Sequence, residues 1–368
     1  MPRRPAFTRI VDALPATVPF VGPETQERKR GAPFLARLGA NENGFGPSPR
    51  AVEAMCRTAP ESWCYGDPEN HDLKEAIARH LGVAPQNIAV GGGIDGLLGL
   101  IVRQYAEPGD PVVNSLGGYP TFNYHVNGFG GQLVNVPYRG DHEDPEALVE
   151  AARQSRAKIL YFANPDNPMG SWHEAEVVEA LIDAVPEDTM LVLDEAYCEF
   201  APASAFPPIS IIRPNLLRMR TFSKAYGMAG MRCGYAVGDE TSIAAFDKIR
   251  NHFGITRITQ AACIAALEDQ AHLRDTVARV HRARARIGAI AAANGLKALP
   301  SATNFVAIDC GRDGAFALSV MNGLVERGIF VRKPAAPGLD RCIRVSCGPD
   351  DALDAFAEKL EETLKALG

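Results

Sequence analysis

Lys224 is the residue whose surroundings most clearly suggest chemistry. It lies in TFSKAYGMAGMRCGYAVG, residues 221–238, where Thr221 and Ser223 supply hydroxyl groups and Arg232 supplies a forked cation. A free lysine amine has a pKa of about 10.4 and is a poor nucleophile at neutral pH, whereas its imine with an aldehyde cofactor is a reactive linkage. Hydroxyls and an arginine are groups that bind phosphate. The segment predicts a phosphorylated aldehyde anchored at Lys224, although a Ser-Lys dipeptide alone is more simply a solvated loop.

Further polar groups follow apolar runs. Asp194 ends the run MLVLD, Tyr197 comes shortly after it, and Asn167 follows the run KILYFA. A carboxylate at the end of a buried strand costs free energy unless a cation or a hydrogen-bond donor faces it. The protonated nitrogen of a pyridoxal ring is such a partner, and Tyr197 and Asn167 would then donate to the ring hydroxyl. Taken alone, Asp194 is more simply a helix cap or one half of an ion pair.

These residues lie at the ends of short apolar segments that alternate with helical segments from residue 111 onward. The strand-like segments are PVVN, QLVNVPY, KILYFA, MLVLDEAY, LLRMRTFS and CGYAVG. Continuous apolar runs of this length are typical of strands buried on both faces, so we predict an α/β domain with a mostly parallel sheet. Because ligands bind at the carboxyl ends of such strands, the sheet would bring Asn167, Asp194 and Lys224 together.

A glycine-rich turn at 91–93 separates a short buried strand from an apolar helix. A helix N-terminus that follows a strand and a turn can hold a phosphate on its backbone N–H groups. The same glycines match G-x-G-x-x-G, so a nicotinamide-binding Rossmann unit is an alternative. That fingerprint requires an acidic residue at the end of the next strand, where this chain has Asn114 and Ser115. We therefore favour a phosphate site that is not part of a dinucleotide fold.

The composition is ordinary for a soluble globular protein of two domains, with 368 residues, 46% hydrophobic and 22% charged. A net charge of −6 with dispersed Lys and Arg favours a small-molecule partner and gives no signature of nucleic-acid or membrane binding. Prolines 15, 19 and 23 interrupt any signal-peptide core. The eight cysteines form no C-x-x-C pair, so we expect no metal site, no disulfide framework and a cytoplasmic location.

The composition and the predicted helices and strands divide the chain into three regions. Residues 1–45, rich in proline and charge, would form an arm with little structure until about residue 39. Residues 46–264 would form a large cofactor-binding domain. Residues 265–368 would form a smaller α+β domain with the strands NFVAID, GIFVRK and CIRVSCG.

Five motifs together resemble a known family. ANENGFGPSP, YGDPEN, NPDNPMG, VLDEAY and TFSKAYGMAGMRCGY are similar to signatures of the fold-type I pyridoxal-phosphate aminotransferases, most of all the histidinol-phosphate aminotransferase group. The resemblance spans roughly residues 35–350. It implies pyridoxal 5'-phosphate as cofactor, a homodimer with shared active sites, and a two-step exchange between an amino donor and a 2-oxo acid.

The resemblance also implies roles at the matching positions. Lys224 would carry the cofactor and, once released, move a proton between substrate and cofactor carbons. The phosphate would be held by hydroxyls, a cation and backbone N–H groups, from Thr221, Ser223, Arg232, Ile94 and Asp95. Tyr119 would stack on the ring, and Tyr65 would reach the phosphate of the other subunit.

On the substrate side, Arg344 matches an arginine that binds a carboxylate or phosphate, and Arg332 matches a second anion-binding arginine. Asn43 would line the same side. Without the resemblance, Arg332 is more simply a surface residue, and Asn41 and Asn43 are more simply turn formers.

Two departures from the family pattern affect the substrate more than the cofactor. The phosphate turn reads Gly-Ile-Asp-Gly at 93–96, without the usual hydroxyl residue and glutamate, and the usual Asn-Pro-Thr-Gly has methionine at position 169. We predict transamination from histidinol phosphate to 2-oxoglutarate. The alternatives are an aromatic or general α-amino acid donor, a threonine-phosphate decarboxylase, and a cofactor-binding regulator, which is disfavoured because no basic DNA-binding module precedes the fold.

Overall fold

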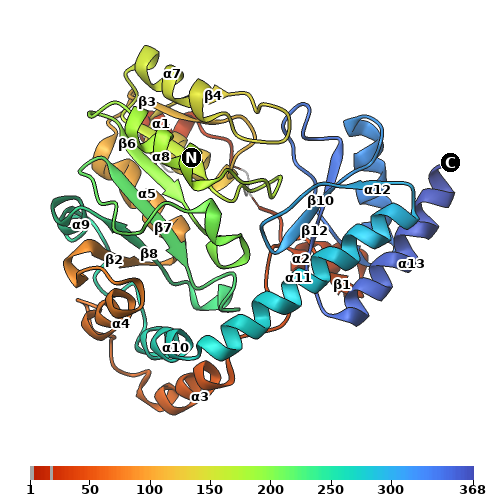
Figure 1. Cartoon of the computed structure of the whole chain (residues 1–368), viewed down its shortest axis with the longest axis horizontal. Coiled ribbons are helices and arrows are strands. Elements are labelled where there is room, and N and C mark those ends of the chain that lie inside the picture. The colour runs from red at the N-terminus through yellow and green to blue at the C-terminus, as the bar shows by residue number, and fades with distance from the viewer. Residues whose placement is uncertain (1–3, 17–19) are drawn as a thin grey trace.

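The computed structural model describes residues 4–16 and 20–368. Figure 1 shows a large sheet with its helices, a smaller α+β unit, and a long helix, α11, that runs between them. The large sheet has seven strands in the order β2-β8-β7-β6-β5-β3-β4. They are β2 (Ile88–Gly91), β3 (Pro111–Ser115), β4 (Gln132–Val136), β5 (Ile159–Ala163), β6 (Met190–Asp194), β7 (Leu216–Thr221) and β8 (Gly234–Gly238). β8 runs antiparallel to both of its neighbours and the other pairings are parallel, which confirms the predicted mostly parallel α/β sheet.

Helices cover both faces of this sheet because its central strands are apolar on both faces. In β5, Ile159 and Tyr161 join one core cluster while Leu160 and Phe162 join another. The first cluster includes residues of α5 (Gly93–Tyr105), α6 (Pro120–Gly128) and α9 (Glu240–Phe246). The second includes residues of α7 (Pro145–Ser155) and α8 (Ala175–Ala184). Successive side chains of a strand point to opposite faces of the sheet. Because helices cover both faces here, the ends of the central strands lie inside the protein.

A group of helices closes one end of the large unit. α10 (Arg257–Glu268) packs against α3 (Pro49–Thr58) and α4 (His71–Leu81). α11 (Gln270–Ala293) follows after a break at Asp269. The Asp269 carboxylate accepts hydrogen bonds from the backbone amide of His272 and from the Ser48 hydroxyl. The predicted boundary between residues 264 and 265 falls inside α10. Division of the chain into two domains remains our proposal, with Asp269 as the better boundary.

The smaller unit is built on an antiparallel sheet of three strands in the order β12-β10-β9. Its strands are β9 (Lys297–Ala298), β10 (Phe305–Asp309) and β12 (Cys342–Ser346), and its helices are α12 (Gly314–Glu326) and α13 (Asp350–Leu367). A separate parallel pair joins β1 (Ala36–Arg37) to β11 (Ile329–Phe330). This pairing attaches the end of the N-terminal arm to the C-terminal unit.

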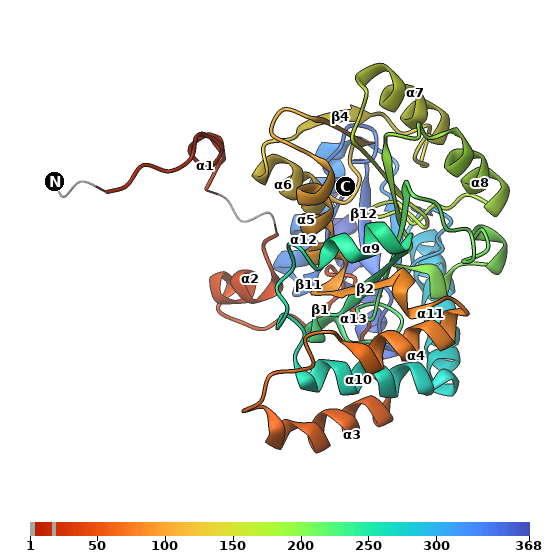
Figure 2. The same cartoon turned by 90° about the vertical axis from the view of Figure 1, so that its left-hand side faces the viewer.

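The arm has more structure than the sequence predicts, so the expectation of little structure before residue 39 is wrong for the described residues. It contains α1 (Arg9–Ala13) and α2 (Pro23–Arg30), and Figure 2 shows both at the edge of the molecule. α2 has proline in its first turn and ends at Gly31, whose φ of 72° suits glycine. Short 3₁₀ turns elsewhere cover Ala59–Glu61, Pro85–Asn87, Cys198–Phe200, Ala203–Ala205 and Ala229–Met231. Within the residues described, no helix is long and apolar enough to cross a bilayer.

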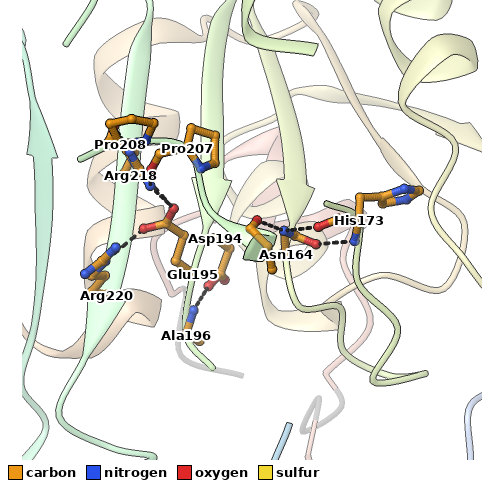
Figure 3. Close-up of polar contacts among 10 residues, drawn as sticks. Asn164, His173, Asp194, Glu195, Ala196, Pro207, Pro208, Arg218 and Arg220 are labelled. Carbon is orange, nitrogen blue, oxygen red and sulfur yellow. Dashed lines mark hydrogen bonds and ion pairs between the residues drawn. The ribbon is translucent and has the colours of Figure 1, made fainter. Parts of the chain in front are cut away.

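A buried ion cluster joins β6 to β7. Glu195 accepts hydrogen bonds from Arg218 at 2.5 and 3.0 Å and from Arg220 at 2.8 Å, as Figure 3 shows. Arg218 also donates to the carbonyls of Pro207 and Pro208. Burial alone would raise the pKa of Glu195, but the two arginines outweigh burial and hold that pKa below its usual value. The cluster fixes the strand that carries Asp194 beside the strand that leads to Lys224.

We expect Glu195→Ala to lower the free energy of unfolding by about 3–5 kcal/mol, because two buried cations would lose their counter-charge. Denaturant unfolding of the purified protein measures this change. The control is Glu53→Ala, which breaks an exposed ion pair with Arg57 at 3.7 Å and should alter stability little. Equal stability of the two variants would contradict the assigned role of the cluster.

Candidate active site

The carboxyl ends of three adjacent parallel strands form the centre of the candidate site. Asp194 at the end of β6 pairs with Ala163 of β5 and with Met219 of β7. The segments that follow these strands carry Asn167 and Lys224. The register therefore brings together three predicted residues that are separated along the chain.

Asp194 is a buried carboxylate with two donors. Its Oδ2 accepts from the Tyr161 hydroxyl at 2.6 Å, and its Oδ1 accepts from the Ala196 amide at 2.9 Å, the contact drawn in Figure 3. Burial nevertheless raises the pKa of Asp194 to about 6. A cation placed against this carboxylate would keep it ionised, and a protonated pyridine nitrogen is such a cation. Sequence reasoning missed Tyr161 because it looks like one more apolar strand residue.

Lys224 is partly buried among charges of both signs, from Arg344, Arg232, Glu42 and Asp194. Its Nζ donates to the Asn41 carbonyl at 3.2 Å and lies 5.5 Å from the ring centroid of Tyr197. Burial, followed by the nearby Arg344, lowers the pKa of Lys224 to about 8. A larger fraction of neutral amine is what a lysine needs to form an imine and to accept a proton from carbon.

Asn41 connects this lysine to the small unit, a role that the sequence alone did not reveal. Its Nδ2 donates to the Tyr197 hydroxyl at 3.1 Å, and its backbone N–H donates to the Ser346 hydroxyl at 3.0 Å. Asn304 in turn donates to the Asn41 carbonyl at 3.1 Å. Asn41 has a φ of 55°, a left-handed conformation that asparagine tolerates, so the turn prediction was partly right.

Asn43 holds the main chain around the lysine. Its Nδ2 donates to the carbonyls of Lys224 and Ala225 at 3.2 and 3.1 Å, and its Oδ1 accepts from the Phe45 amide at 3.1 Å. The side chain is engaged at both ends by the protein itself. We therefore propose a positioning role for Asn43, and its predicted place on the substrate side stays a prediction.

The N-terminus of α5 and Arg232 form a cradle that fits a phosphate. Among the described residues no side chain caps this helix, so the first backbone N–H groups, including those of Ile94 and Asp95, are available to a ligand. A Cβ at Gly93 would lie 2.6 Å from the Arg232 guanidinium, so only glycine allows this close approach. Arg232 also reaches the Ser223 hydroxyl at 3.4 Å.

Other predicted residues surround this cradle. Thr221 donates to the Cys233 carbonyl at 3.2 Å and accepts from the Ser223 amide at 3.0 Å, so it shapes the loop that presents Ser223. Asp95 contacts His125 at 3.1 Å. Tyr119 is half-buried, and burial raises its pKa while the charges of Asp95, Asp194 and Arg232 also act on it. Tyr119 directly precedes α6 and packs against the core cluster that contains Ile94, and stacking of a cofactor ring on it stays a prediction.

Two arginines from the small unit form the substrate side. Arg344 Nη1 donates to Asn167 Oδ1 at 2.5 Å and Nη2 donates to the Gly39 carbonyl at 3.4 Å. Arg332 is bridged to Arg344 through their backbones, and its guanidinium stacks on Phe20 at 4.4 Å. Burial, and to a smaller extent the charge of Arg332, lowers the pKa of Arg344 to about 10. Two partly buried cations side by side are stabilised by an anion.

Tyr65 lies apart from these residues. Its side chain is 74% exposed and packs against Phe253 at 4.5 Å, while its carbonyl accepts from Arg257. Across the described residues, no hydrogen bond or aromatic contact joins Tyr65 to the cradle of its own chain. The contact of the Tyr65 hydroxyl with the phosphate site of another subunit therefore stays a prediction.

The residues present fit pyridoxal phosphate: a bare helix N-terminus with an arginine for the phosphate, a buried carboxylate for the ring nitrogen, and a lysine of lowered pKa for the aldehyde. The family model for aminotransferase class I and II matches residues 35–360. The histidinol-phosphate aminotransferase of Roseiflexus castenholzii is 36% identical over 361 residues, covering 96% of each chain.

Solved structures agree with this match. The histidinol-phosphate aminotransferase from Sinorhizobium meliloti, in complex with pyridoxal-5'-phosphate, is 55% identical, with a TM-score of 0.96 and 98% of each chain covered. The aspartate aminotransferase from Thermus thermophilus with maleate is 25% identical, with a TM-score of 0.82, covering 98% of this chain and 100% of that chain.

The lowered pKa of Lys224 predicts how attachment of pyridoxal phosphate depends on pH. Only the neutral amine attacks an aldehyde, so the initial rate should rise with pH and reach half of its maximum at about 8. Stopped-flow absorbance with cofactor-free protein measures this rate. Free Nα-acetyl-lysine, with a pKa of about 10.4, is the reference. A midpoint equal to that of the reference would contradict the assigned environment.

We expect Tyr161→Phe to weaken binding of pyridoxal phosphate about tenfold, because Asp194 would lose a hydrogen bond to a charged group. Absorbance titration of the cofactor-free protein gives the dissociation constant. The control is Tyr105→Phe at the far end of α5, which should leave the constant unchanged. Unchanged affinity in Tyr161→Phe would mean that this hydroxyl does not support the carboxylate.

Proposed function

The chain belongs to the aminotransferase class I and II family, and on that premise we propose that it uses pyridoxal phosphate to transfer the amino group of histidinol phosphate to 2-oxoglutarate. The observation that carries the proposal is the partly buried Arg344, held by Asn167 and placed beside Arg332. Histidinol phosphate has a phosphate and 2-oxoglutarate has a second carboxylate, so each presents an anion that these arginines suit. The names of the similar enzymes support the same substrate. These observations do not support the alternative of a nicotinamide-binding Rossmann unit.

The chain's own residues divide the work. Bound pyridoxal phosphate supplies an electron sink that stabilises a carbanion at the substrate carbon. Asp194 holds a proton on the ring nitrogen through its negative charge, and Tyr161 keeps that carboxylate in place. Lys224 Nζ accepts and returns the proton of the substrate carbon, for which a pKa of about 8 is well matched to neutral pH. Arg344 orients the substrate by its anion.

The second subunit is part of the proposal. We infer a homodimer in which Tyr65 contacts the phosphate bound by the partner, since Tyr65 is exposed on its own chain. Its neighbours Trp63 and Phe253 are exposed as well, at 86% and 51%. Large exposed aromatic side chains that lie together are typical of a surface that another chain covers. The cytoplasmic location stays a prediction.

Absorbance of the cofactor-loaded protein tests the substrate. Histidinol phosphate, and neither phenylalanine nor threonine phosphate, should convert the lysine-bound cofactor to its amine form, and 2-oxoglutarate should restore it. Conversion by phenylalanine would move the donor to aromatic amino acids. Release of carbon dioxide from threonine phosphate would indicate the decarboxylase.

Lys224→Ala tests the chemical role. We expect the rate of amino transfer to fall by at least about 10²–10⁴, the usual contribution of a positioned proton carrier. The control is Lys248→Ala, an exposed lysine of the same unit, which should retain the full rate. Full activity of the Lys224→Ala protein would refute the mechanism.

A further inference from the structure

Two buried carboxyl groups lie directly behind the substrate arginine. Glu143 and Asp166 are each 2% exposed. Glu143 belongs to the segment between β4 and α7, and Asp166 immediately precedes Asn167, the residue that receives Arg344. Neither carboxyl group has a role in the chemistry described above.

Asp166 organises the turn that presents Asn167. Its Oδ1 accepts from the Tyr138 hydroxyl at 2.8 Å, and its Oδ2 accepts from the Met169 amide at 3.0 Å. Its backbone carbonyl accepts from the Gly170 amide at 3.1 Å. Because both carboxylate oxygens act as acceptors, Asp166 behaves as the ionised member of the pair.

Glu143 is placed where a second negative charge is unfavourable. Its Oε2 accepts from the Ala163 amide at 3.3 Å, but within the described part of the chain its Oε1 lacks a donor of good geometry. The Ser115 hydroxyl is also without a partner there. Ser115 Cβ and Glu143 Oε1 both lie within 4 Å of the position that a Cβ at Gly118 would occupy, so the two side chains are neighbours. Asp166 is within hydrogen-bonding reach of the same glutamate. A proton on Glu143 removes the repulsion and supplies the missing donor.

Other titratable and charged groups around the pair favour this arrangement. Burial and the charge of Asp166 raise the pKa of Glu143 well above its usual value. Burial raises the pKa of Asp166 to about 6, and the hydrogen bonds from Met169, Tyr138 and Glu143, with the charge of Arg344, oppose a larger rise. Among the other groups, the Ser115 hydroxyl lowers the pKa of Glu143 and the Tyr138 hydroxyl donates to Asp166, whereas His173 Nε2 contacts only the backbone carbonyl of Glu143.

We propose that Glu143 is a positioning residue of the active site, which keeps its proton, donates a hydrogen bond to Asp166 and so fixes the turn that holds Asn167 against Arg344. The inference rests on the proposed function only in that Arg344 binds the anionic end of the substrate. Ionisation of Glu143 would place two repelling charges under the turn and disturb the Asn167 contact. Loss of the proton should therefore weaken substrate binding and leave the chemical step at Lys224 largely intact.

Infrared spectroscopy tests the proton without any catalysis. A buried carboxylic acid has a C=O stretching band distinct from that of a carboxylate, so the difference spectrum of wild type and Glu143→Gln at neutral pH should contain the acid band. Glu150→Gln, which changes an exposed glutamate on α7, is the control and should lack it. Absence of the acid band from the Glu143→Gln difference would overturn the proposal.

Affinity for maleate, an unreactive dicarboxylate, tests the positioning role, with cofactor absorbance as the readout. Glu143→Gln keeps a donor towards Asp166 and should bind maleate within about twofold of wild type, since one neutral hydrogen bond replaces another. Glu143→Ala removes the donor and should weaken binding at least about tenfold. Equal loss in both variants would show a structural effect only and would overturn the positioning role.

Steady-state kinetics separate this inference from the choice of substrate. In Glu143→Ala the KM for the active donor should rise while kcat changes little. In wild type the KM should also rise at alkaline pH, where Glu143 ionises. Glu143→Gln has no proton to lose and should lack this rise. If histidinol phosphate proves inactive, the infrared and maleate results still decide the role of Glu143. A fall in kcat alone would contradict it.

Discussion

Burial of the Asp194 carboxylate is the constraint on which the site depends. The parallel register of β5, β6 and β7 carries this group to the end of a strand that is apolar on both faces, where two donors do not fully offset its desolvation. The charge of Lys224 relieves part of this penalty, and a cation bound against the carboxylate would relieve more of it. Cofactor binding and the stability of the strand ends are therefore linked, and the Glu195 cluster beneath them keeps β6 and β7 in register.

The remaining groups are brought to Asp194 by the small unit and the arm. Arg344 comes from β12, and the Asn41 carbonyl that accepts from Lys224 comes from the segment after β1. These contributions lower the pKa of the lysine by enclosing it and by adding positive charge. The large unit thus supplies the binding surface for the cofactor, whereas the small unit and the arm set the basicity of the lysine and the choice of substrate.

The sequence predicted the sheet because its strands are unbroken apolar runs, and it predicted Lys224, Asp194, Asn167 and Arg232 because chemistry requires those residue types at strand ends. It did not predict Tyr161 or Glu143, whose roles depend on which face of a strand or loop turns towards a partner far away in the chain. The arm was underestimated for a similar reason. β1 has only two residues and is defined by its pairing with β11, which no local pattern reveals. The resemblance also did not reveal that the Asn43 side chain bonds the main chain at Lys224 and Ala225, since a resemblance says nothing of which atoms a side chain contacts.

The contacts of Asn41 have a mechanical consequence. Its backbone N–H is bonded to Ser346 and its carbonyl to Asn304, so it is attached to the small unit, while its side chain reaches Tyr197 on the large one. A rotation of the small unit would carry Asn41 and Arg344 away from Lys224 in one movement and admit water to the amine. The amine would then regain the basicity of an exposed lysine, so the packing of the two units against each other is what keeps the pKa of Lys224 low.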